Sequence, residues 1–278
     1  MKKYEILDIE EFGRRLIMTN DLDPLYVALY KSKAEIGRRT LCNWLLAYWC
    51  FYHAGVASYM SELDGEGYWK TMMVAARNET GGWPRGKERR HFRAVNAINS
   101  IEYFMAQGKS PSAIIDDWYA RTLKELSKKV QQAVGFGPWI AFKVADMMER
   151  VLGCPISFDE TEVMMYSEPK KAAWMLWNER MAPKYPPNTK FKEDAVLKSV
   201  VENLTIHFSK LNSHLAPPRY ERPVNIQEIE TILCKWKSHK NGHYPLNNDI
   251  HEIRDGLGQW VGQSRVARIL LKNMPEEK

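Results

Sequence analysis

The chain has 278 residues, of which 45% are hydrophobic and ten are tryptophan, so it can bury a large core and is not a disordered protein. Its 40 Lys and Arg against 34 Asp and Glu give a net charge of +6, which suits a polyanionic partner without identifying one. The four cysteines are far apart and form no CxxC pair, which argues against a disulfide framework. The charged start MKKYEILDIEEF lacks the apolar run of a signal peptide, which predicts a cytoplasmic protein.

Helical periodicity dominates the sequence and alternating strand patterns are scarce, so we predict an all-α fold. Residues 41–60 are strongly apolar, but Asn43 and His53 interrupt them, which favours a buried core helix over a membrane span. Helices are expected near residues 8–18, 33–60, 66–78, 88–107, 111–118, 121–133, 138–152, 170–180, 191–212, 226–239 and 249–272, the last of which need not be continuous.

Two proline-rich loops, at 181–190 and 215–223, separate the final helices from the rest, because proline removes a backbone donor and disfavours continued helix. We therefore expect a helical domain over residues 1–215. Residues 216–278 would form a helical extension that packs on this domain or belongs to it.

The stretch YWCFYHAGVASY places Trp49, Tyr52 and His53 close together. Most of these side chains are expected in the core, and a lone histidine in such a helix is more often a hydrogen-bonded core residue than a catalyst. An extruded nucleobase also needs aromatic walls and a polar group that reads its edge, which this segment could supply.

A basic and aromatic block follows at WPRGKERRHFRAVNAI, residues 83–98. If it is helical, Arg89 and Arg93 are i, i+4 neighbours on one face, while Phe92 and Val95 turn inward. Guanidinium groups suit phosphate oxygens because they bind them in a bidentate manner. A charge run is ordinarily a solvated face. Arginine predominates here and alternates with aromatic residues, which favours a site.

Residues 121–153 read as two helices joined by a tight glycine turn. The first helix has a basic face that includes Lys128 and Lys129, and the second begins at Pro138 and ends at Gly153. In the turn, Gly135 and Gly137 allow positive φ angles, so the backbone amides of residues 135–137 (Gly135, Phe136 and Gly137) could bind a nucleic-acid phosphate. An isolated pair of glycines between helices is usually only a turn.

The whole string from GFGPW to the aspartate twenty residues after the tryptophan resembles the helix-hairpin-helix DNA glycosylase superfamily. That resemblance implies a hairpin that grips the DNA backbone, and an aspartate, here Asp159, that faces an extruded nucleotide. Trp139 occupies the place of the lysine of lyase-type members, so no Schiff base is implied, and Lys143 lies one turn further on. Asp159, followed by Glu160 and Glu162, could instead be an acidic helix start.

Four blocks in order make the resemblance more specific: DPLYVALY, LLAYWCFYHAGVASYMSE, PRGKERRHFRAVNAI and FGPWIAFKVADMMERVLG. Together they resemble the amino acid:DNA transferases of bacteriophages, also named alpha-glutamyl/putrescinyl thymine pyrophosphorylases, over at least residues 21–168. The family implies a glycosylase-like fold and a reaction in duplex DNA. Pyrophosphate on 5-hydroxymethyluracil, installed by a phage DNA base kinase, is displaced by a small amino acid, with glycine the expected one.

The reaction that the resemblance implies sets several chemical tasks, and the sequence offers candidate residues for them. A cationic clamp on the leaving pyrophosphate would consist of Arg89, Arg90, His91 and Arg93. Asp159 would act as the general base or stabilise positive charge at the methylene carbon. Lys143 would bind phosphate or the amino acid's carboxylate. Trp49, Tyr52, His53 and Trp139 would surround the base. No cofactor and no ATP are expected, because the DNA already carries the activated group, and the infected host's cytoplasm is the expected location.

Two other functions stay open from the sequence: a glycosylase that removes a modified base, and a DNA-binding protein without catalysis. Cys234, His239, His243 and His251 lie close together in sequence, but only His239 and His243 have zinc-like spacing, so no metal is predicted. The alternative for that segment is a basic loop, with Lys235, Lys237 and Lys240, that touches the DNA backbone.

Overall fold

The computed structural model describes residues 4–79, 81–158, 166–210 and 215–277, and divides the chain into two compact units. Unit 1 comprises Met1–Pro24, Ser157–Ile250 and Pro275–Lys278. Unit 2 comprises Leu25–Ile156 and His251–Met274. The boundary expected near residue 215 falls inside unit 1, because residues on both sides of it pack together there.

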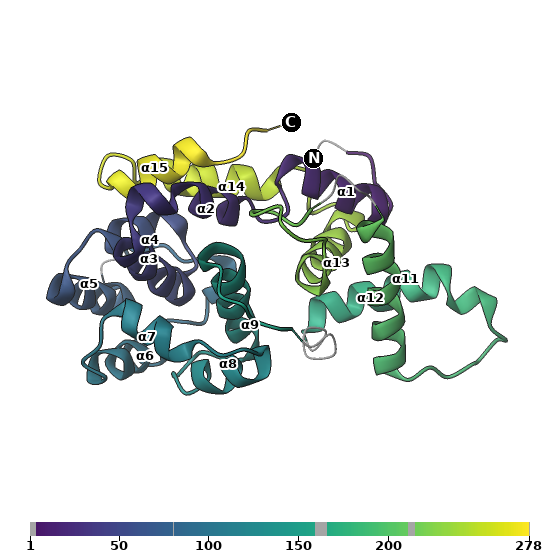
Figure 1. The fold of residues 1–278 in the computed structure, drawn as a ribbon, viewed down its shortest axis with the longest axis horizontal. Coiled ribbons are helices and arrows are strands. Elements are labelled where there is room, and N and C mark those ends of the chain that lie inside the picture. Colours follow the sequence, from purple (N-terminus) through teal and green to yellow (C-terminus); the bar gives the residue numbers. More distant parts are fainter. Residues whose placement is uncertain (1–3, 80, 159–165, 211–214, 278) are drawn as a thin grey trace. The chain divides into compact units, whose positions relative to one another are not determined.

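The prediction of an all-α fold is confirmed, since helices account for the regular structure throughout the described ranges (Figure 1). Unit 2 is built around α3, which contacts α4, α7 and α9, and α15 covers α4. Its helices are α2 (Pro24–Ile36), α3 (Arg38–Phe51), α4 (Ala54–Ser61), α5 (Gly65–Arg77), α6 (Val95–Ala106), α7 (Pro111–Trp118), α8 (Leu123–Val130), α9 (Pro138–Met147), α14 (Asn248–Gly258, which begins in unit 1) and α15 (Arg265–Asn273), with a 3₁₀ turn η1 (Lys87–Arg89) and a π-helical turn η2 (Met148–Leu152).

The single helix predicted over residues 33–60 is wrong, since α2, α3 and α4 occupy the region. Gly37 has a φ of 77° and ends α2, and Tyr52 has a φ of 53° and ends α3. His53 then begins α4, because its Nδ1 accepts a hydrogen bond from the amide of Val56 at 3.2 Å. Apolar residues on every side of α3 hid these breaks, since a fully buried helix has no polar stripe that changes at its end.

The helix predicted from residue 88 begins only at Val95, as α6. Residues Lys87–Arg89 form a 3₁₀ turn, and Ala94 has a φ of 50°, a conformation that L-residues rarely adopt. Phe92 is buried as expected, but Val95 is 65% exposed, so its predicted inward direction is wrong.

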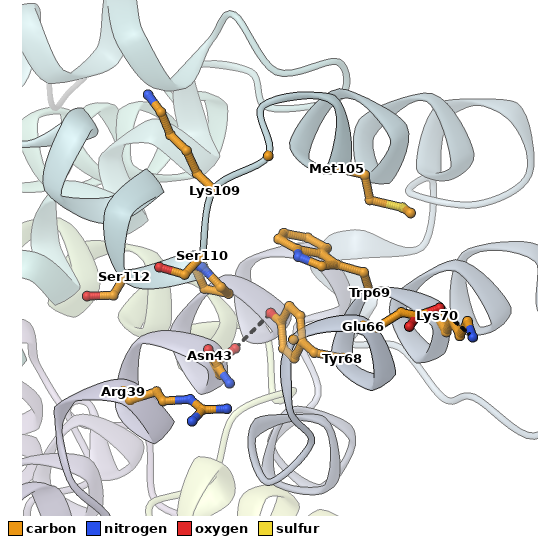
Figure 2. A pocket seen from close by; sticks show the side chains of 13 residues that line it. Arg39, Asn43, Glu66, Tyr68, Trp69, Lys70, Met105, Lys109, Ser110 and Ser112 are labelled. Atoms are coloured by element: carbon orange, nitrogen blue, oxygen red, sulfur yellow. Dashed lines mark hydrogen bonds and ion pairs between the residues drawn. The ribbon is translucent and has the colours of Figure 1, made fainter.

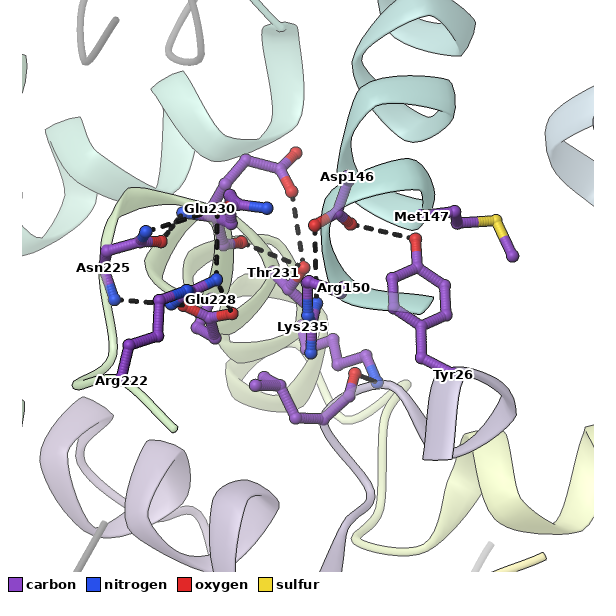
Figure 3. Close-up of polar contacts among 12 residues, drawn as sticks. Tyr26, Asp146, Met147, Arg150, Arg222, Asn225, Glu228, Glu230, Thr231 and Lys235 are labelled. Atoms are coloured by element: carbon purple, nitrogen blue, oxygen red, sulfur yellow. Dashed lines mark hydrogen bonds and ion pairs between the residues drawn. The ribbon is translucent and has the colours of Figure 1, made fainter. Parts of the chain in front are cut away.

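Unit 1 packs α11 against α12 and α13, and α1 against α13. A capping box at Asn225 and Glu228 starts α13, and Arg222 forms an ion pair with Glu228 at 2.9 Å (Figure 3). The helices are α1 (Ile9–Thr19), α11 (Ser167–Arg180), α12 (Glu193–Ser209) and α13 (Ile226–Lys240), with a 3₁₀ turn η3 (Ala182–Lys184).

The basic segment of α13 is structural and already neutralised. Lys235 is buried, donates to the backbone oxygens of Asp21 and Leu22 at 2.6 Å each, and lies 2.8 Å from an Asp249 carboxylate oxygen. Lys237 and Lys240 form ion pairs with glutamates of α11. The prediction of a basic loop is therefore wrong, because Lys235, Lys237 and Lys240 lie on the helix α13 and each of them meets a carboxylate inside unit 1.

His239 is likewise a core residue. Its Nε2 accepts the amide of Leu7 at 3.0 Å, its Nδ1 lies 2.8 Å from the backbone oxygen of Tyr244, and its ring stacks on Phe12. Within the ranges that the structure describes, no three His, Cys, Asp or Glu side chains gather in a way that could hold a metal ion.

None of the described helices has both the length and the hydropathy needed to cross a membrane. Residues 41–60 instead form most of α3, a break at Tyr52 and α4, with Trp44, Trp49 and Phe51 fully buried.

Candidate functional site

The hairpin of α8 and α9 is closed by a turn that requires glycine at one position. Gly135 has a φ of 77°, a conformation that strains any residue with a side chain, and a Cβ there would crowd the Phe92 ring at 3.2 Å. Gly137 differs from the prediction: its φ is −78°, and it is the N-cap of α9 in extended conformation. The turn therefore uses one left-handed residue.

The start of α9 presents backbone donors that have no acceptor in the described parts of the chain. No side chain caps Gly137, and the amides of Gly137, Trp139 and Ile140 precede the first intrahelical bond, which Ala141 makes to Gly137. The amide of Phe136 already donates to Ala133 at 3.0 Å, and the Phe136 ring is buried. Phe136 is therefore a core anchor of the turn and not a phosphate ligand.

Arg89 fixes this turn to the end of α3. Its Nε donates to the backbone oxygen of Cys50 at 3.1 Å, its Nη1 donates to that of Gly135 at 2.7 Å, and the guanidinium lies 4.0 Å from the centre of the Phe92 ring. Burial lowers the pKa of Arg89 to about 10, so it stays protonated at neutral pH. The predicted helical face that pairs Arg89 with Arg93 is wrong, because Arg89 is only 7% exposed and serves backbone carbonyls.

Arg85 and Gly86 attach the basic segment to the ends of α3 and α5. The Arg85 guanidinium donates to the backbone oxygens of Phe92 and Ala75, and the Gly86 amide donates to Phe51 at 3.0 Å. A Cβ on Gly86 would lie 2.3 Å from the Tyr52 backbone oxygen, so only glycine allows this approach. Residues 85–92 are thus fastened to the ends of α3 and α5.

Three cationic or polar side chains of the same segment point to solvent: Arg90, His91 and Arg93 are exposed. Arg90 Nε donates to His91 Nε2 at 3.1 Å, and its Nη1 donates to the backbone oxygen of Lys87 at 3.2 Å. The clamp predicted from the sequence is reduced to these three residues, since Arg89 faces inward.

Aromatic rings lead from the core to the first turn of α9. Trp44 stacks on Tyr48, Tyr48 stacks on Tyr52, and Tyr52 lies 5.2 Å from Trp139, measured between ring centres. Tyr52 and Trp139 are half-buried and remain accessible. Trp49 is fully buried with its Nε1 directed at the Met147 sulfur at 3.2 Å, so it is a core residue and does not line an accessible site.

His53 is neutral at physiological pH, because burial lowers its pKa and its Nδ1 accepts the Val56 amide. The imidazole proton therefore lies on Nε2. This is the hydrogen-bonded histidine that the sequence analysis kept as the alternative to a catalyst.

The predicted basic residues of the hairpin differ in their surroundings. Lys128 and Lys129 are both exposed, and Lys129 also donates to the backbone oxygens of Asp117 and Tyr119 at 3.0 and 2.7 Å, so it caps α7. Lys143 is 9% exposed and lies 5.0 Å from the Phe142 ring centre, so it is not a surface cation.

Beyond Lys143, α9 carries a buried polar group that the sequence analysis missed. The Tyr26 hydroxyl donates to Asp146 at 2.9 Å, and Arg150 lies 3.6 Å from the same carboxylate (Figure 3). This group lies where α9 widens into the π-helical turn η2, which ends at Gly153 with a φ of 81°. The i, i+4 spacing of Asp146 and Arg150 was its visible signal. Asp159, the predicted catalytic carboxylate, lies outside the described residues.

Unit 2 is a helical domain suited to a polyanion, because Arg90, His91 and Arg93 are exposed on the segment that Arg89 joins to the hairpin turn, and the first amides of α9 have no acceptor in the described parts of the chain. Residues 17–243 match the amino acid:DNA transferase family, and the chain belongs to this family. It is therefore a transferase that joins DNA and an amino acid. It is similar to a glycinyltransferase of Pseudomonas phage PaMx11, with 43% identity over 99% of this chain and 98% of the relative. It is also similar to a putrescinyltransferase of Delftia phage PhiW-14, with 27% identity over 92% and 79%.

Proposed function

We propose that this protein transfers glycine to pyrophosphorylated 5-hydroxymethyluracil in duplex phage DNA. The observation that carries the choice of glycine is the 43% identity, over nearly the whole length of both chains, to a protein named glycinyltransferase. Family membership favours transfer over base removal and over binding alone.

The proposed step is a displacement at the methylene carbon of the base. The glycine amine forms a C–N bond, the C–O bond breaks with its electron pair on the departing pyrophosphate, and the amine proton passes to a base. The glycosidic bond is untouched. Negative charge grows on the leaving group, so fixed cations near it lower the barrier more than they strengthen substrate binding.

Arg90, His91 and Arg93 are our candidates for contact with the pyrophosphate, because they are exposed and lie on a segment that Arg85 and Arg89 fasten to the core. The amides at the start of α9 would hold a DNA phosphate, and Tyr52 and Trp139 would contact the extruded base. Arg89 does not contact the substrate in this proposal, but positions the hairpin turn through its hydrogen bond to the Gly135 backbone oxygen.

Asp159 is proposed as the general base, with Lys143 as the candidate for the carboxylate of glycine. Activation energy resides in the modified DNA, so we expect no cofactor and no ATP in the transfer step. A phage DNA base kinase would supply the pyrophosphorylated base, and the reaction would take place in the host cytoplasm.

The test is mass spectrometry of nucleosides after digestion of duplex DNA that carries pyrophosphorylated 5-hydroxymethyluracil and has been incubated with the protein. Glycine, each other amino acid and putrescine are supplied in separate reactions. We expect a new nucleoside with glycine alone. With ¹⁵N-labelled glycine, the mass of this nucleoside should increase by the difference between the two nitrogen isotopes. A product only with putrescine would contradict the choice of glycine, and free base with abasic DNA would indicate a glycosylase.

The role of Asp159 has its own test in the same assay. Asp159→Asn should abolish or strongly slow product formation and leave DNA binding intact, and Glu162→Gln is the matched control in the same acidic stretch. Full turnover by Asp159→Asn would remove this residue from the mechanism.

A further inference from the structure

A pocket apart from the hairpin lies in unit 2, between α3, α5 and the junction of α6 with α7 (Figure 2). Its volume is about 780 Å³, within the range of roughly 300–1,000 Å³ typical of small-molecule sites. The hairpin lies beyond the aromatic core, because Phe104 packs between Trp69 of this pocket and Phe136 of the turn. The proposed transfer chemistry makes no use of it.

The walls of the pocket suit a flat ring. Trp69 is half-buried, stacks on Phe104 at 6.4 Å between ring centres and meets Tyr68 edge to face at 5.0 Å, so its indole is held at a fixed angle. Met105 and Pro111 supply further apolar lining. A planar heterocycle placed on an indole face gains stacking energy that is largely independent of its identity.

A buried amide provides a polar group in this apolar setting. Asn43 lines the pocket and is only 5% exposed, and its side-chain nitrogen donates to the backbone oxygens of Ser61 and Leu63, both at 3.4 Å. Its backbone oxygen accepts the Tyr68 hydroxyl at 2.9 Å. The side-chain oxygen has no donor among the residues that the structure describes, so it is available to an N–H group of a ligand.

The charges at the rim favour an anion. Lys70 is paired with Glu66 and Lys109 with Asp117, at 2.6 and 2.5 Å, so these two lysines are locally neutralised. Arg39 is exposed and has no carboxylate partner in the described parts of the chain. Ser110 caps the N-terminus of α7 at the same rim, which adds hydroxyl and amide donors.

We propose that this pocket binds a nucleotide, with the base on Trp69, a ring N–H directed to the Asn43 oxygen and the phosphate at Arg39 and the start of α7. Glycine is far smaller than the pocket and has no apolar surface to cover Trp69, so the amino acid substrate does not fit its chemistry. The shared chemistry is that of a free mononucleotide or of one nucleotide in a single DNA strand.

The test is isothermal titration of the full chain with thymidine 5′-monophosphate, with thymidine and with a short oligothymidylate. We expect saturable binding of the monophosphate and weaker binding of the nucleoside. Trp69→Leu should weaken monophosphate binding about ten-fold and Trp69→Phe should restore most of it, because phenylalanine keeps a stacking face. Arg39→Gln should weaken the monophosphate about five-fold and leave thymidine unaffected.

Arg77→Gln, which removes an exposed arginine of α5 that is not part of the pocket, is the matched control and should change nothing. If the oligothymidylate shows the same sensitivity to Trp69→Leu and Arg39→Gln, the ligand is a nucleotide of a DNA strand. If only the monophosphate does, it is a free nucleotide. The proposal fails if the wild-type chain shows no saturable monophosphate binding, or if Arg39→Gln and a folded Trp69→Leu both bind it as the wild type does. Because the readout is binding, failure of the transfer reaction would not affect it.

Discussion

Two basic segments of this chain look alike in sequence and differ in what neutralises them. Residues 85–93 and 235–243 each combine several cations with histidine and an aromatic residue. In unit 1, Lys235, Lys237 and Lys240 each meet a carboxylate. In unit 2, the half-buried Arg85 and the buried Arg89 meet backbone carbonyls.

The difference matters because a carbonyl satisfies the hydrogen bonds of a guanidinium without cancelling its charge, whereas a carboxylate does both. The lysine charges of the segment at 235–243 are consequently cancelled by carboxylates of unit 1. In the segment at 85–93, Lys87 pairs with Glu252 at 2.9 Å, but Arg85 and Arg89 bond to carbonyls and keep their charge, and the exposed Arg90 and Arg93 add to it. The segment at 85–93 therefore stays positive, although both segments carry similar charge in the sequence.

The largest expected effect is the loss of Lys235. Lys235→Met leaves the fully buried carboxylate of Asp21 without its nearby cation, and two backbone oxygens lose their donor. We expect the free energy of unfolding to fall by about 3–5 kcal/mol in urea denaturation. Lys237→Gln, whose ion pair is partly exposed, should cost no more than about 1 kcal/mol. Equal effects of the two substitutions would contradict the contrast between a buried and a surface cation.

The second prediction concerns pH. Burial raises the pKa of Asp21 from 3.8 to about 6, so the stability linked to its protonation is complete below pH 4 and is lost as pH rises through 6. Asp21→Asn cannot titrate. Relative to wild type, its free energy of unfolding should therefore rise between pH 4 and pH 7 by roughly 3 kcal/mol. Parallel stability curves over this range would show that Asp21 titrates normally in the folded state.

The third substitution tests the fastening of the hairpin turn. Arg89→Lys replaces a planar fork that reaches both Cys50 and Gly135 with a single ammonium group. We expect a loss of about 2 kcal/mol in stability. Weaker DNA binding should also appear at temperatures where the variant is fully folded, because the turn amides lose their support. An Arg89→Lys protein with wild-type melting temperature and DNA affinity would show that the turn holds without this contact.

The smallest effect on stability should come from the exposed residues. Arg90→Gln with Arg93→Gln should leave the free energy of unfolding within about 0.5 kcal/mol of wild type. DNA affinity should fall, and the slope of log affinity against log salt should shrink by about 1–2. Lys237→Gln with Lys240→Gln removes the same charge from the neutralised segment and should leave that slope unchanged. A similar loss in both double variants would mean that net charge alone governs binding.

Periodicity was sufficient to predict the all-α class and the approximate places of α1, α5, α7, α8, α12 and α13, because these helices show polar stripes, caps or proline boundaries. It failed where burial removes the stripe, as in α3. It also failed between Arg89 and Ala94, where the guanidinium contacts of Arg85 and Arg89 override a helical pattern. Those contacts join residues distant in sequence, which local spacing does not reveal.

The candidate site shows the same division. The left-handed Gly135 matches what residue type suggested, and Arg90, His91 and Arg93 are exposed although the predicted helix is absent there. Trp49 was predicted to contact the base, but its ring is fully buried, and the Phe136 amide, predicted to bind phosphate, already donates to Ala133. The nucleotide-sized pocket at Trp69 brings four helices together and left no local pattern.

The central claim is that the chain replaces pyrophosphate on DNA with glycine. Its most direct test is the stoichiometry of one reaction, in which released pyrophosphate and the glycine-bearing nucleoside are counted from the same sample of modified duplex. The account predicts one pyrophosphate for each new nucleoside, with no free base and no requirement for ATP. Pyrophosphate release without the nucleoside, or release of free base, would contradict it.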